Sequence, residues 1–207
     1  MLQTSTVYPD TLAILNRVME MPALSSFNLV GGTALALQIG HRISIDLDLF
    51  THQDYDDAVI LDAVKNLGQV EIFVNKPPFL QLRVDDVKMD FLKFPYAFVQ
   101  EYETIEGVRL VSVETIAVMK LLAVSRRGVK KDFYDLYFIL ERYTLAEIVY
   151  LFKVKLPNVD MFHILKSLTY FGDADPDPDP KMLIKVSWAV VKKTIIAKTQ
   201  AYLKTML

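Results

Sequence analysis

Cysteine is absent from the 207-residue chain, and histidine occurs only three times. Without cysteine there is no disulfide framework, no thiolate metal site and no thiol nucleophile. The three histidines, His41, His52 and His163, are too scattered to suggest a zinc site. The sequence therefore excludes thiol chemistry and gives no support to a zinc centre.

Long apolar runs are also missing. No stretch approaches the roughly 20 apolar residues of a membrane-spanning helix, and the first ten residues lack the features of a signal peptide. We therefore expect a soluble, cytoplasmic protein with no membrane partner. The formal net charge of −2 provides no global basic field for nucleic acid, and the only basic cluster is RRGVKK, residues 126–131.

The order of patterns along the chain predicts an α+β protein with two parts. Hydrophobic residues make up 52% of the chain and charged residues 23%, as in ordinary globular proteins. Strand and helix patterns mix in residues 1–111, whereas residues 112–207 carry helical patterns alone. We expect the first part to be the core domain and the second to be a helical domain that completes the functional site.

Capping and turn residues predict the element boundaries. A helix begins at Asp10, a strand precedes Gly31, a short helix stops at Gly40, and Asp54 caps a helix that ends at Gly68. Further predicted strands cover 43–50, 69–75, 79–84 and 86–94, with a strand pair, or a strand leading into a helix cap at Ser112, over 103–113. Further predicted helices cover 113–127, 131–143, 145–155 and 159–171, and a last helix begins near Met182.

The alternating run ISIDLDLF places two carboxylates on one side of a predicted strand. Its apolar face comprises Ile43, Ile45, Leu47 and Leu49, and its polar face Ser44, Asp46 and Asp48. Two carboxylates so close repel each other unless a cation lies between them. Magnesium prefers such hard oxygen ligands, so the pair predicts a magnesium site, although a solvated strand face is the commoner meaning of Asp-x-Asp.

The segment Gly31, Gly32 and Thr33 lies where a strand runs into a helix. Free backbone N–H groups at a helix start, with no side chains in the way, form a phosphate-binding cradle. A glycine pair alone is more often an ordinary turn. The order strand, Gly-Gly, short helix and Asp-x-Asp strand is more specific, and it predicts a nucleoside triphosphate site.

A two-metal phosphoryl-transfer site usually needs a third carboxylate from a neighbouring strand. Asp90 in DVKMDFLKF is the candidate, because it shares a face of that predicted strand with Lys88 and Leu92. The alternative is a surface aspartate on an edge strand.

Residues 31–50, GGTALALQIGHRISIDLDLF, resemble the nucleotidyltransferase AbiEii/AbiGii toxin family, a branch of the polymerase β-like nucleotidyltransferases. The run VETIAVMKLLAVSRRGVKKDFYDLYFIL, residues 113–140, resembles the later motif of the same family. The resemblance implies a mixed sheet flanked by helices and followed by an all-helical region. It also implies transfer of a nucleoside monophosphate from an NTP to an acceptor hydroxyl, with release of pyrophosphate.

The resemblance assigns roles to the residues of both blocks. Gly31, Gly32 and Thr33 would hold the triphosphate, and Asp46, Asp48 and Asp90 would be the catalytic ligands of two magnesium ions. Asp90 could also help to deprotonate the acceptor.

Several charged residues can be interpreted either as site residues or as ordinary structural or surface residues. Lys120 lies among apolar neighbours, so it either reaches solvent or meets an anion, and the family motif favours the triphosphate. Arg42 is a phosphate ligand or a surface arginine. The motif marks Lys131 and Asp135 as contacts to nucleotide or acceptor, whereas Asp132 also fits a helix N-terminus stabilised by its dipole.

The leading hypothesis is a magnesium-dependent toxin of a type IV toxin–antitoxin or abortive-infection pair. Its acceptor is the 3′ end of a tRNA, another RNA or a protein side chain, and an antitoxin protein is the expected partner. A catalytically silent nucleotide-binding protein is one alternative. A nucleotidyltransferase that modifies a small molecule and is not a toxin is another.

Overall fold

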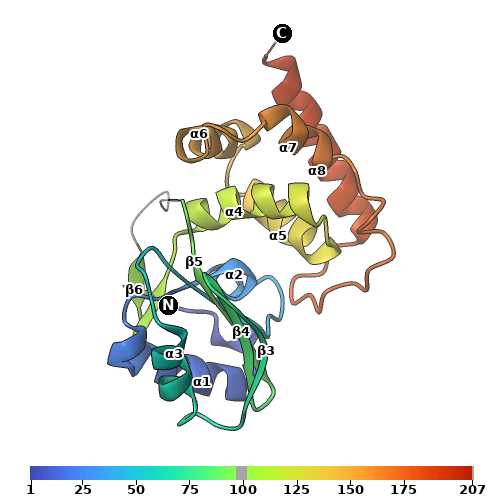
Figure 1. Ribbon diagram of the computed structural model, residues 1–207. Coiled ribbons are helices and arrows are strands. Elements are labelled where there is room, and N and C mark those ends of the chain that lie inside the picture. The colour runs from blue at the N-terminus through green and yellow to red at the C-terminus, as the bar shows by residue number, and fades with distance from the viewer. Residues whose placement is uncertain (97–101, 207) are drawn as a thin grey trace. The chain divides into compact units, whose positions relative to one another are not determined.

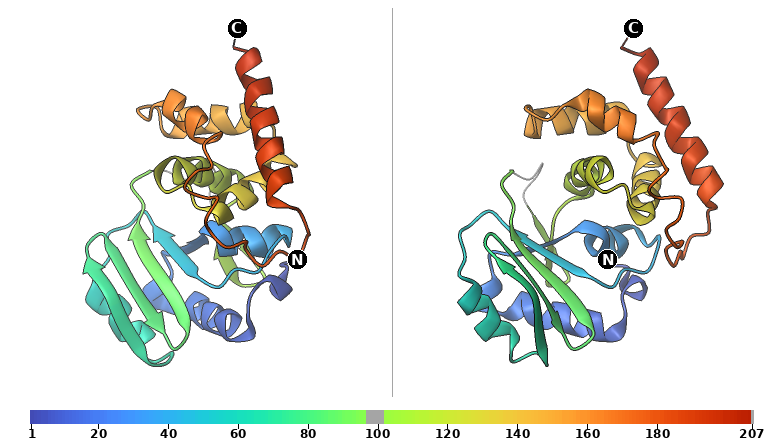
Figure 2. Two further views of the ribbon diagram at one scale, coloured as in Figure 1. Left: turned by 90° about the vertical axis from the view of Figure 1, so that its right-hand side faces the viewer. Right: turned by 45° about the vertical axis from the view of Figure 1, so that its right-hand side comes forward.

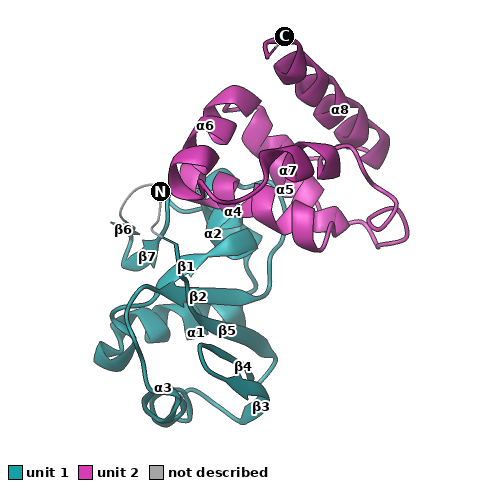
Figure 3. Ribbon diagram, turned by 45° about the horizontal axis from the view of Figure 1, so that its top comes forward, with its two compact units in different colours: residues 1–112 teal, residues 113–207 magenta. Residues whose placement is uncertain are grey.

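The computed structural model describes residues 1–96 and 102–206, and the chain divides into two compact units, residues 1–112 and 113–207 (Figure 3). The first unit combines a sheet with helices, and the second is built from helices (Figure 1). An α+β architecture was predicted from the sequence and is confirmed.

Unit 1 contains a seven-stranded mixed sheet in the order β3-β4-β5-β2-β1-β7-β6. The β2/β5 and β1/β7 pairs are parallel, and the other neighbours are antiparallel. Its elements are η1 Thr4–Thr6, α1 Pro9–Glu20, η2 Pro22–Leu24, β1 Asn28–Val30, α2 Gly31–Ile39, β2 Leu47–Thr51, α3 Asp57–Val64, β3 Val70–Lys76, β4 Phe79–Val84, β5 Val87–Lys93, β6 Glu103–Ile105 and β7 Val108–Leu110.

The two faces of the central strands differ sharply in burial. Alternate residues of β2, β4 and β5 are buried, and the residues between them are mostly half-exposed. The buried set on these strands is Leu47, Leu49, Thr51, Leu80, Leu82, Val84, Val87, Met89 and Phe91. Helices α1 and α3 lie on the same face of the sheet, and α2 lies on the other (Figure 1, Figure 2).

The strand predicted over 43–50 begins only at Leu47. The backbone N–H of Ser44 donates to the carbonyl of Thr6 at 2.9 Å rather than to a neighbouring strand, so no ladder forms there. The placement of Ile45 on a buried face is wrong, because this residue is 50% exposed. The alternation of apolar and polar residues thus begins at residue 43, before the backbone pairs with neighbouring strands at Leu47.

Two predicted helix boundaries are also wrong. The helix expected from Asp54 is capped instead by Asp56, which accepts from the N–H of Ala58 at 2.9 Å, while Asp54 pairs with Lys93 at 2.6 Å. That helix ends at Val64 rather than at Gly68.

The last helix begins at Trp188 rather than near Met182. Residues 181–187 form no helix. Ser187 caps the helix by accepting from the N–H of Val190 at 3.4 Å. The side chain that satisfies the first N–H groups thus sets the boundary.

Unit 2 consists of α4 Val113–Arg126, α5 Lys130–Leu140, α6 Leu145–Lys155, α7 Met161–Ser167 and α8 Trp188–Lys204. Aromatic side chains join α5 to α8: the ring of Trp188 stacks on that of Tyr134 at 5.7 Å and meets Phe133 edge-on at 5.8 Å. Within the described residues, no helix is both long and apolar enough to cross a membrane.

Arg109 of β7 ties three segments of unit 1 together. Its Nη1 donates to the carbonyl of Met19 at 2.7 Å, its Nη2 to that of Leu24 at 3.1 Å, and its Nε to that of Phe27 at 3.1 Å. A half-buried carbonyl that loses such a charged donor is costly because water replaces it poorly.

We expect Arg109→Met to lower the free energy of unfolding by roughly 3 kcal/mol, because three carbonyls lose their donor at once. Urea unfolding followed by circular dichroism measures the loss. Arg83→Met is the control, since Arg83 makes an exposed pair with Glu71 and lies over the exposed ring of Phe73, and exposed contacts of these kinds contribute about 0–1 kcal/mol each. Equal losses in the two variants would show that the three carbonyl bonds contribute little.

Candidate active site

The register of β2 and β5 brings Asp48 and Asp90 together. Their Cα atoms are direct partners in the parallel ladder, and Asp48 is also the partner of Val30 on β1. Neighbouring strands lie about 4.8 Å apart, and ladder partners project to the same face. Both carboxylates therefore stand side by side on the partly exposed face of the sheet.

Asp46 lies immediately before β2 and is partly exposed. Its backbone carbonyl accepts a hydrogen bond from the hydroxyl of Thr33, which also hydrogen-bonds the hydroxyl of Ser44 at 2.9 Å. Thr33 was predicted to hold a phosphate. In the structure its buried hydroxyl holds the segment that carries Asp46.

Two glycines open α2, and each lies against a charged side chain. A Cβ on Gly31 would overlap Oδ2 of Asp48, and a Cβ on Gly32 would overlap Nη2 of Arg42. Gly31 also has a φ of 69°, in the region that favours glycine. The glycine pair is therefore required by close approach of a carboxylate and a guanidinium.

The N-terminus of α2 has no side-chain cap, because the N-cap position is occupied by Val30. Backbone N–H groups of a first helical turn point along the axis and favour anions. Gly31 and Gly32 place no side chain over them. This geometry suits the phosphate-binding role predicted for the two glycines.

Arg42 is only 4% exposed, so the alternative of a surface arginine is wrong. Its Nη1 donates to the carbonyl of Ile43 at 3.0 Å, and its Nη2 lies against Gly32. A buried positive charge therefore lies at the start of α2, next to the segment that leads to the carboxylates.

Asp90 has two polar neighbours, of which Lys88 was expected on the same strand face and Gln81 was not. Gln81 on β4 donates to Oδ1 at 3.0 Å, and Lys88 lies 3.6 Å from Oδ2. Because β5 lies between β4 and β2, the alternative of an edge-strand aspartate is also wrong. Gln81 is the ladder partner of Asp90, and the sequence pattern of neither strand predicts this pairing.

The donor set suits magnesium, which is commonly bound by one or two carboxylates together with water and substrate phosphates. Asp48 and Asp90 supply two such carboxylates on adjacent strands, and Asp46 adds a third next to β2. Across residues 1–96 and 102–206, however, no three acidic or histidine side chains are gathered as a group that could hold a metal ion, so Asp46, Asp48 and Asp90 do not converge on one point. A magnesium ion here would need ligands from water and from the substrate phosphates.

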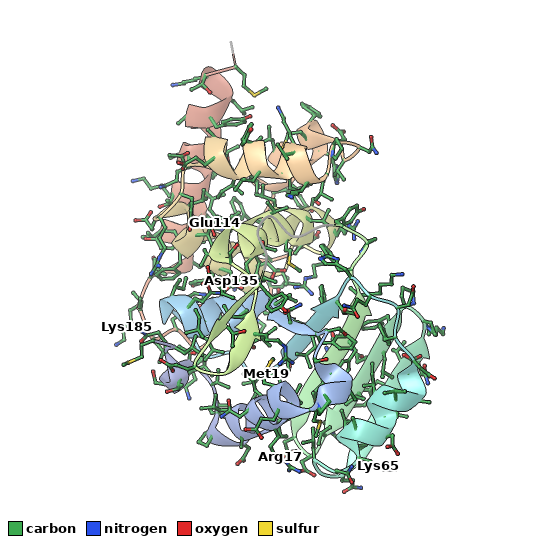
Figure 4. The ribbon with its side chains drawn as sticks, turned by 90° about the vertical axis from the view of Figure 1, so that its left-hand side faces the viewer. Arg17, Met19, Lys65, Glu114, Asp135 and Lys185 are labelled. Atoms are coloured by element: carbon green, nitrogen blue, oxygen red, sulfur yellow. The ribbon has the colours of Figure 1, made fainter. Side chains whose placement is uncertain are left out.

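In unit 2, Lys120 lies at the centre of a buried ion-pair cluster. Its Nζ is 2.6 Å from Oδ1 of Asp132 and 2.5 Å from Oδ2 of Asp135, and both aspartates are fully buried (Figure 4 labels Asp135). Arg127 adds a bond from Nε to Oδ2 of Asp132 at 2.8 Å. The ammonium predicted to meet a triphosphate thus already has two carboxylate partners.

The pKa of Asp132 is lowered by this cluster. Burial opposes its ionisation, but the Lys120 ammonium and the Arg127 guanidinium outweigh that effect and hold the pKa below its ordinary value of 3.8. The expectation that Asp132 only stabilises a helix N-terminus missed this buried pairing.

The predicted basic cluster RRGVKK is partly committed to contacts inside unit 2. Lys130 is buried, its backbone N–H donates to the carboxylate of Asp177 at 2.9 Å, and its Nζ lies 3.2 Å from Asp179. Lys131 is exposed at the first turn of α5. The cluster is therefore smaller as a surface patch than its sequence indicates.

Several solved structures share the fold of this chain. MenT4, a nucleotidyltransferase toxin of Mycobacterium tuberculosis, is 14% identical with a TM-score of 0.61, and the alignment covers 92% of this chain and 82% of MenT4. The antibiotic-resistance factor ANT(2'')-Ia is 15% identical with a TM-score of 0.53, covering 70% and 91% of the two chains. JHP933 of Helicobacter pylori is 20% identical with a TM-score of 0.53, covering 95% and 90%. These likenesses establish the nucleotidyltransferase fold.

The sequence itself narrows the class to a family. The profile of the nucleotidyl transferase AbiEii toxins of type IV toxin–antitoxin systems matches residues 13–202. The chain therefore belongs to this family, as its motifs predicted, and is a nucleotidyltransferase. An uncharacterized protein of Aquifex aeolicus is 33% identical over 196 residues, which cover 92% of this chain and 94% of the relative.

We expect Gly31→Ala to lower nucleotidyl transfer on the order of 100-fold, because the new Cβ displaces the carboxylate of Asp48. Gly107→Ala is a matched control: Gly107 also has a positive φ, of 84°, but nothing lies within 4 Å of its added Cβ. Both variants carry backbone strain of about 1–2 kcal/mol. If both retain equal activity, the contact between Gly31 and Asp48 is not needed.

We expect Asp132→Asn to lower the free energy of unfolding by roughly 3 kcal/mol at neutral pH, because it weakens the pairing of a buried ammonium. The carboxylate stabilises the fold fully above its unfolded pKa of 3.8, and this contribution is lost as the pH falls through the lowered folded pKa. The difference between wild type and variant should therefore shrink in acid.

Urea unfolding at a series of pH values measures this difference. Asp173→Asn is the control because Asp173 is exposed, and its effect should stay within about 0.5 kcal/mol. A difference that does not change with pH would contradict the role of the Asp132 charge.

Proposed function

We propose that the protein is a magnesium-dependent nucleotidyltransferase that acts as the toxin of a type IV toxin–antitoxin pair in the cytoplasm. It moves a nucleoside monophosphate from an NTP to an acceptor hydroxyl. The observation that carries the proposal is the pairing of Asp48 with Asp90 in the β2/β5 ladder, beside the uncapped start of α2. Family membership supports the reaction class.

The start of α2 provides the site for the triphosphate. Gly31 and Gly32 leave the first backbone N–H groups uncovered by side chains, and the helix dipole favours an anion there. The guanidinium of Arg42 behind Gly32 adds positive charge at the same end of the helix. Thr33 acts indirectly, by holding the carbonyl of Asp46.

Asp46, Asp48 and Asp90 would hold the magnesium ions, and these ions would neutralise charge on the phosphates and lower the pKa of the attacking hydroxyl. Gln81 and Lys88 orient Asp90. The acceptor oxygen forms a bond to the α-phosphorus, the bond from that phosphorus to the oxygen of the departing group breaks, and pyrophosphate leaves. The hydroxyl proton passes to Asp90 or to water.

Contacts of Lys120 with phosphate, and of Lys131 and Asp135 with nucleotide or acceptor, stay predictions. Lys120 and Arg127 balance Asp132 and Asp135 in charge, which favours a role of the Lys120 cluster in fixing α4 against α5. Lys131 is the more accessible of the two lysines.

The charge of the C-terminal segment favours RNA over a protein side chain as the acceptor. Residues 181–207 contain six lysines and no aspartate or glutamate, in a chain whose net charge is −2. Four of these lysines are exposed: Lys181, Lys185, Lys193 and Lys204. A cationic stretch of this kind attracts a phosphate backbone without regard to base sequence.

We expect Asp48→Asn and Asp90→Asn each to lower label transfer by at least on the order of 100-fold, because each removes a charge at the reacting phosphate. The assay incubates the protein with each labelled NTP, magnesium and total RNA or total protein. Asp86→Asn is the control, since Asp86 is exposed in the turn between β4 and β5. It should transfer label as the wild type does.

Transfer that survives both substitutions would refute the carboxylate mechanism. Wild-type protein that binds an NTP in calorimetry but labels nothing would instead favour a catalytically silent nucleotide-binding protein. Label found on neither RNA nor protein but on a small molecule would refute the RNA acceptor. Rescue of growth by a co-expressed neighbouring gene would support an antitoxin partner.

A further inference from the structure

A strip of aromatic side chains lies on the same face of the sheet as the paired carboxylates. It comprises Phe50, His52, Phe94 and Tyr96, here called the aromatic strip. The rings of Phe50 and Phe94 are 5.6 Å apart, those of His52 and Phe94 are 6.5 Å apart, and those of Phe94 and Tyr96 meet edge-on at 5.5 Å. The four rings thus form one connected cluster.

Strand alternation places this strip on the carboxylate face. Phe50 is two residues after Asp48 on β2, and Phe94 is four residues after Asp90 on β5, so each pair shares a side. The backbone N–H of Phe94 donates to the carbonyl of Thr51 at 2.8 Å, which continues the parallel register past the end of β5. The register that pairs the carboxylates therefore also brings the rings together.

The strip is held in place yet left accessible. Nδ1 of His52 donates to the carbonyl of Phe94 at 3.1 Å, because a carbonyl can only accept. None of the four rings is buried, whereas Phe27 and Phe91, the ring pair below the sheet, are almost fully buried at 1% and 0% exposure. The fold hides its aromatic core on one face and leaves a second aromatic cluster partly exposed on the other.

Position along the strands indicates what such a strip could contact. At about 3.3 Å per residue, Phe50 lies ~7 Å and His52 ~13 Å beyond Asp48. In a nucleotide whose sugar hydroxyl lies at the carboxylates, the base ring lies at a comparable distance from them. Aromatic side chains stack nucleobases with little regard to sequence, because every base has a flat π-face.

We propose that the aromatic strip stacks the terminal nucleobase of a single-stranded nucleic acid acceptor, with its hydroxyl directed to Asp90. This assignment rests on the proposed function. The acceptor is favoured over the NTP because Phe94 and Tyr96 directly follow β5, the strand of Asp90. The uncapped glycines of α2 instead follow β1, on the other side of Asp48. The aromatic strip beside Asp90 thus contacts the acceptor, and the glycines beside Asp48 contact the NTP.

Phe94→Leu tests the proposal, because it removes the central ring while keeping apolar volume. The probes are a short oligoadenylate and an abasic ribose-phosphate chain of the same length. We expect the variant to bind oligoadenylate at least about tenfold more weakly, in line with ~1–3 kcal/mol per stacked base, and to bind the abasic chain as the wild type does. Phe94→Trp, which keeps a stacking ring, should restore the affinity.

Phe73→Leu is the matched control. Phe73 is an aromatic residue on the edge strand β3, outside the strip, and at 48% exposure its side chain is more accessible than that of Phe94. It should leave oligoadenylate binding unchanged. Equal losses in Phe73→Leu and Phe94→Leu, or wild-type binding that does not distinguish the two probes, would overturn the stacking role.

Calorimetric titration with each NTP separates the two sources of a nucleobase. The proposal expects unchanged NTP affinity in Phe94→Leu, together with a raised KM for oligoadenylate wherever that oligomer is labelled. A loss confined to NTP binding would overturn assignment to the acceptor. Because oligoadenylate binding needs no turnover, its outcome is independent of label transfer by Asp48→Asn and Asp90→Asn.

Discussion

The site depends on two like charges held side by side where a glycine backbone leaves room for one of them. Asp48 faces Asp90 across the β2/β5 ladder, and its carboxylate occupies the space of a side chain at Gly31. Repulsion between such carboxylates must be offset by cations or by hydrogen-bond donors. Lys88 and Gln81 provide part of that compensation at Asp90. The fold thus maintains a negative site on a strand face that remains open to a cation and a phosphate.

Unit 2 shows the opposite use of the same groups. Asp132 and Asp135 are fully buried, and two cations of their own unit balance their charge. A buried pair of this kind fixes geometry, since removing one member leaves a charge without compensation. Half-exposed Asp48 and Asp90 can instead exchange partners with a substrate. Burial, more than residue type, therefore separates the carboxylates suited to catalysis from those suited to structure.

Local sequence was enough to predict the glycine pair, the Asp-x-Asp run and the α+β class. It did not predict contacts between residues that are distant in the sequence. Asp48 and Asp90 are neighbours only because β2 and β5 pair in one register, and Gln81 joins them through a third strand. Likewise the anion that Lys120 meets was predicted to be the triphosphate, because its partner Asp132 comes from the next helix. The start of β2 was misplaced because alternation of residue type says nothing about which backbone groups find a partner.

Register also couples the carboxylates to the aromatic strip. Side chains alternate along a strand, so a slip of one residue between β2 and β5 would leave Asp48 beside the position of a buried residue and separate Phe50 from Leu92. The buried face resists such a slip, because Met89 and Phe91 would lose their place beside Leu47 and Leu49. Core packing below the sheet therefore fixes the spacing between charge and rings above it. A site whose two halves share one ladder can hold the reacting hydroxyl and the terminal base of one acceptor at a constant separation.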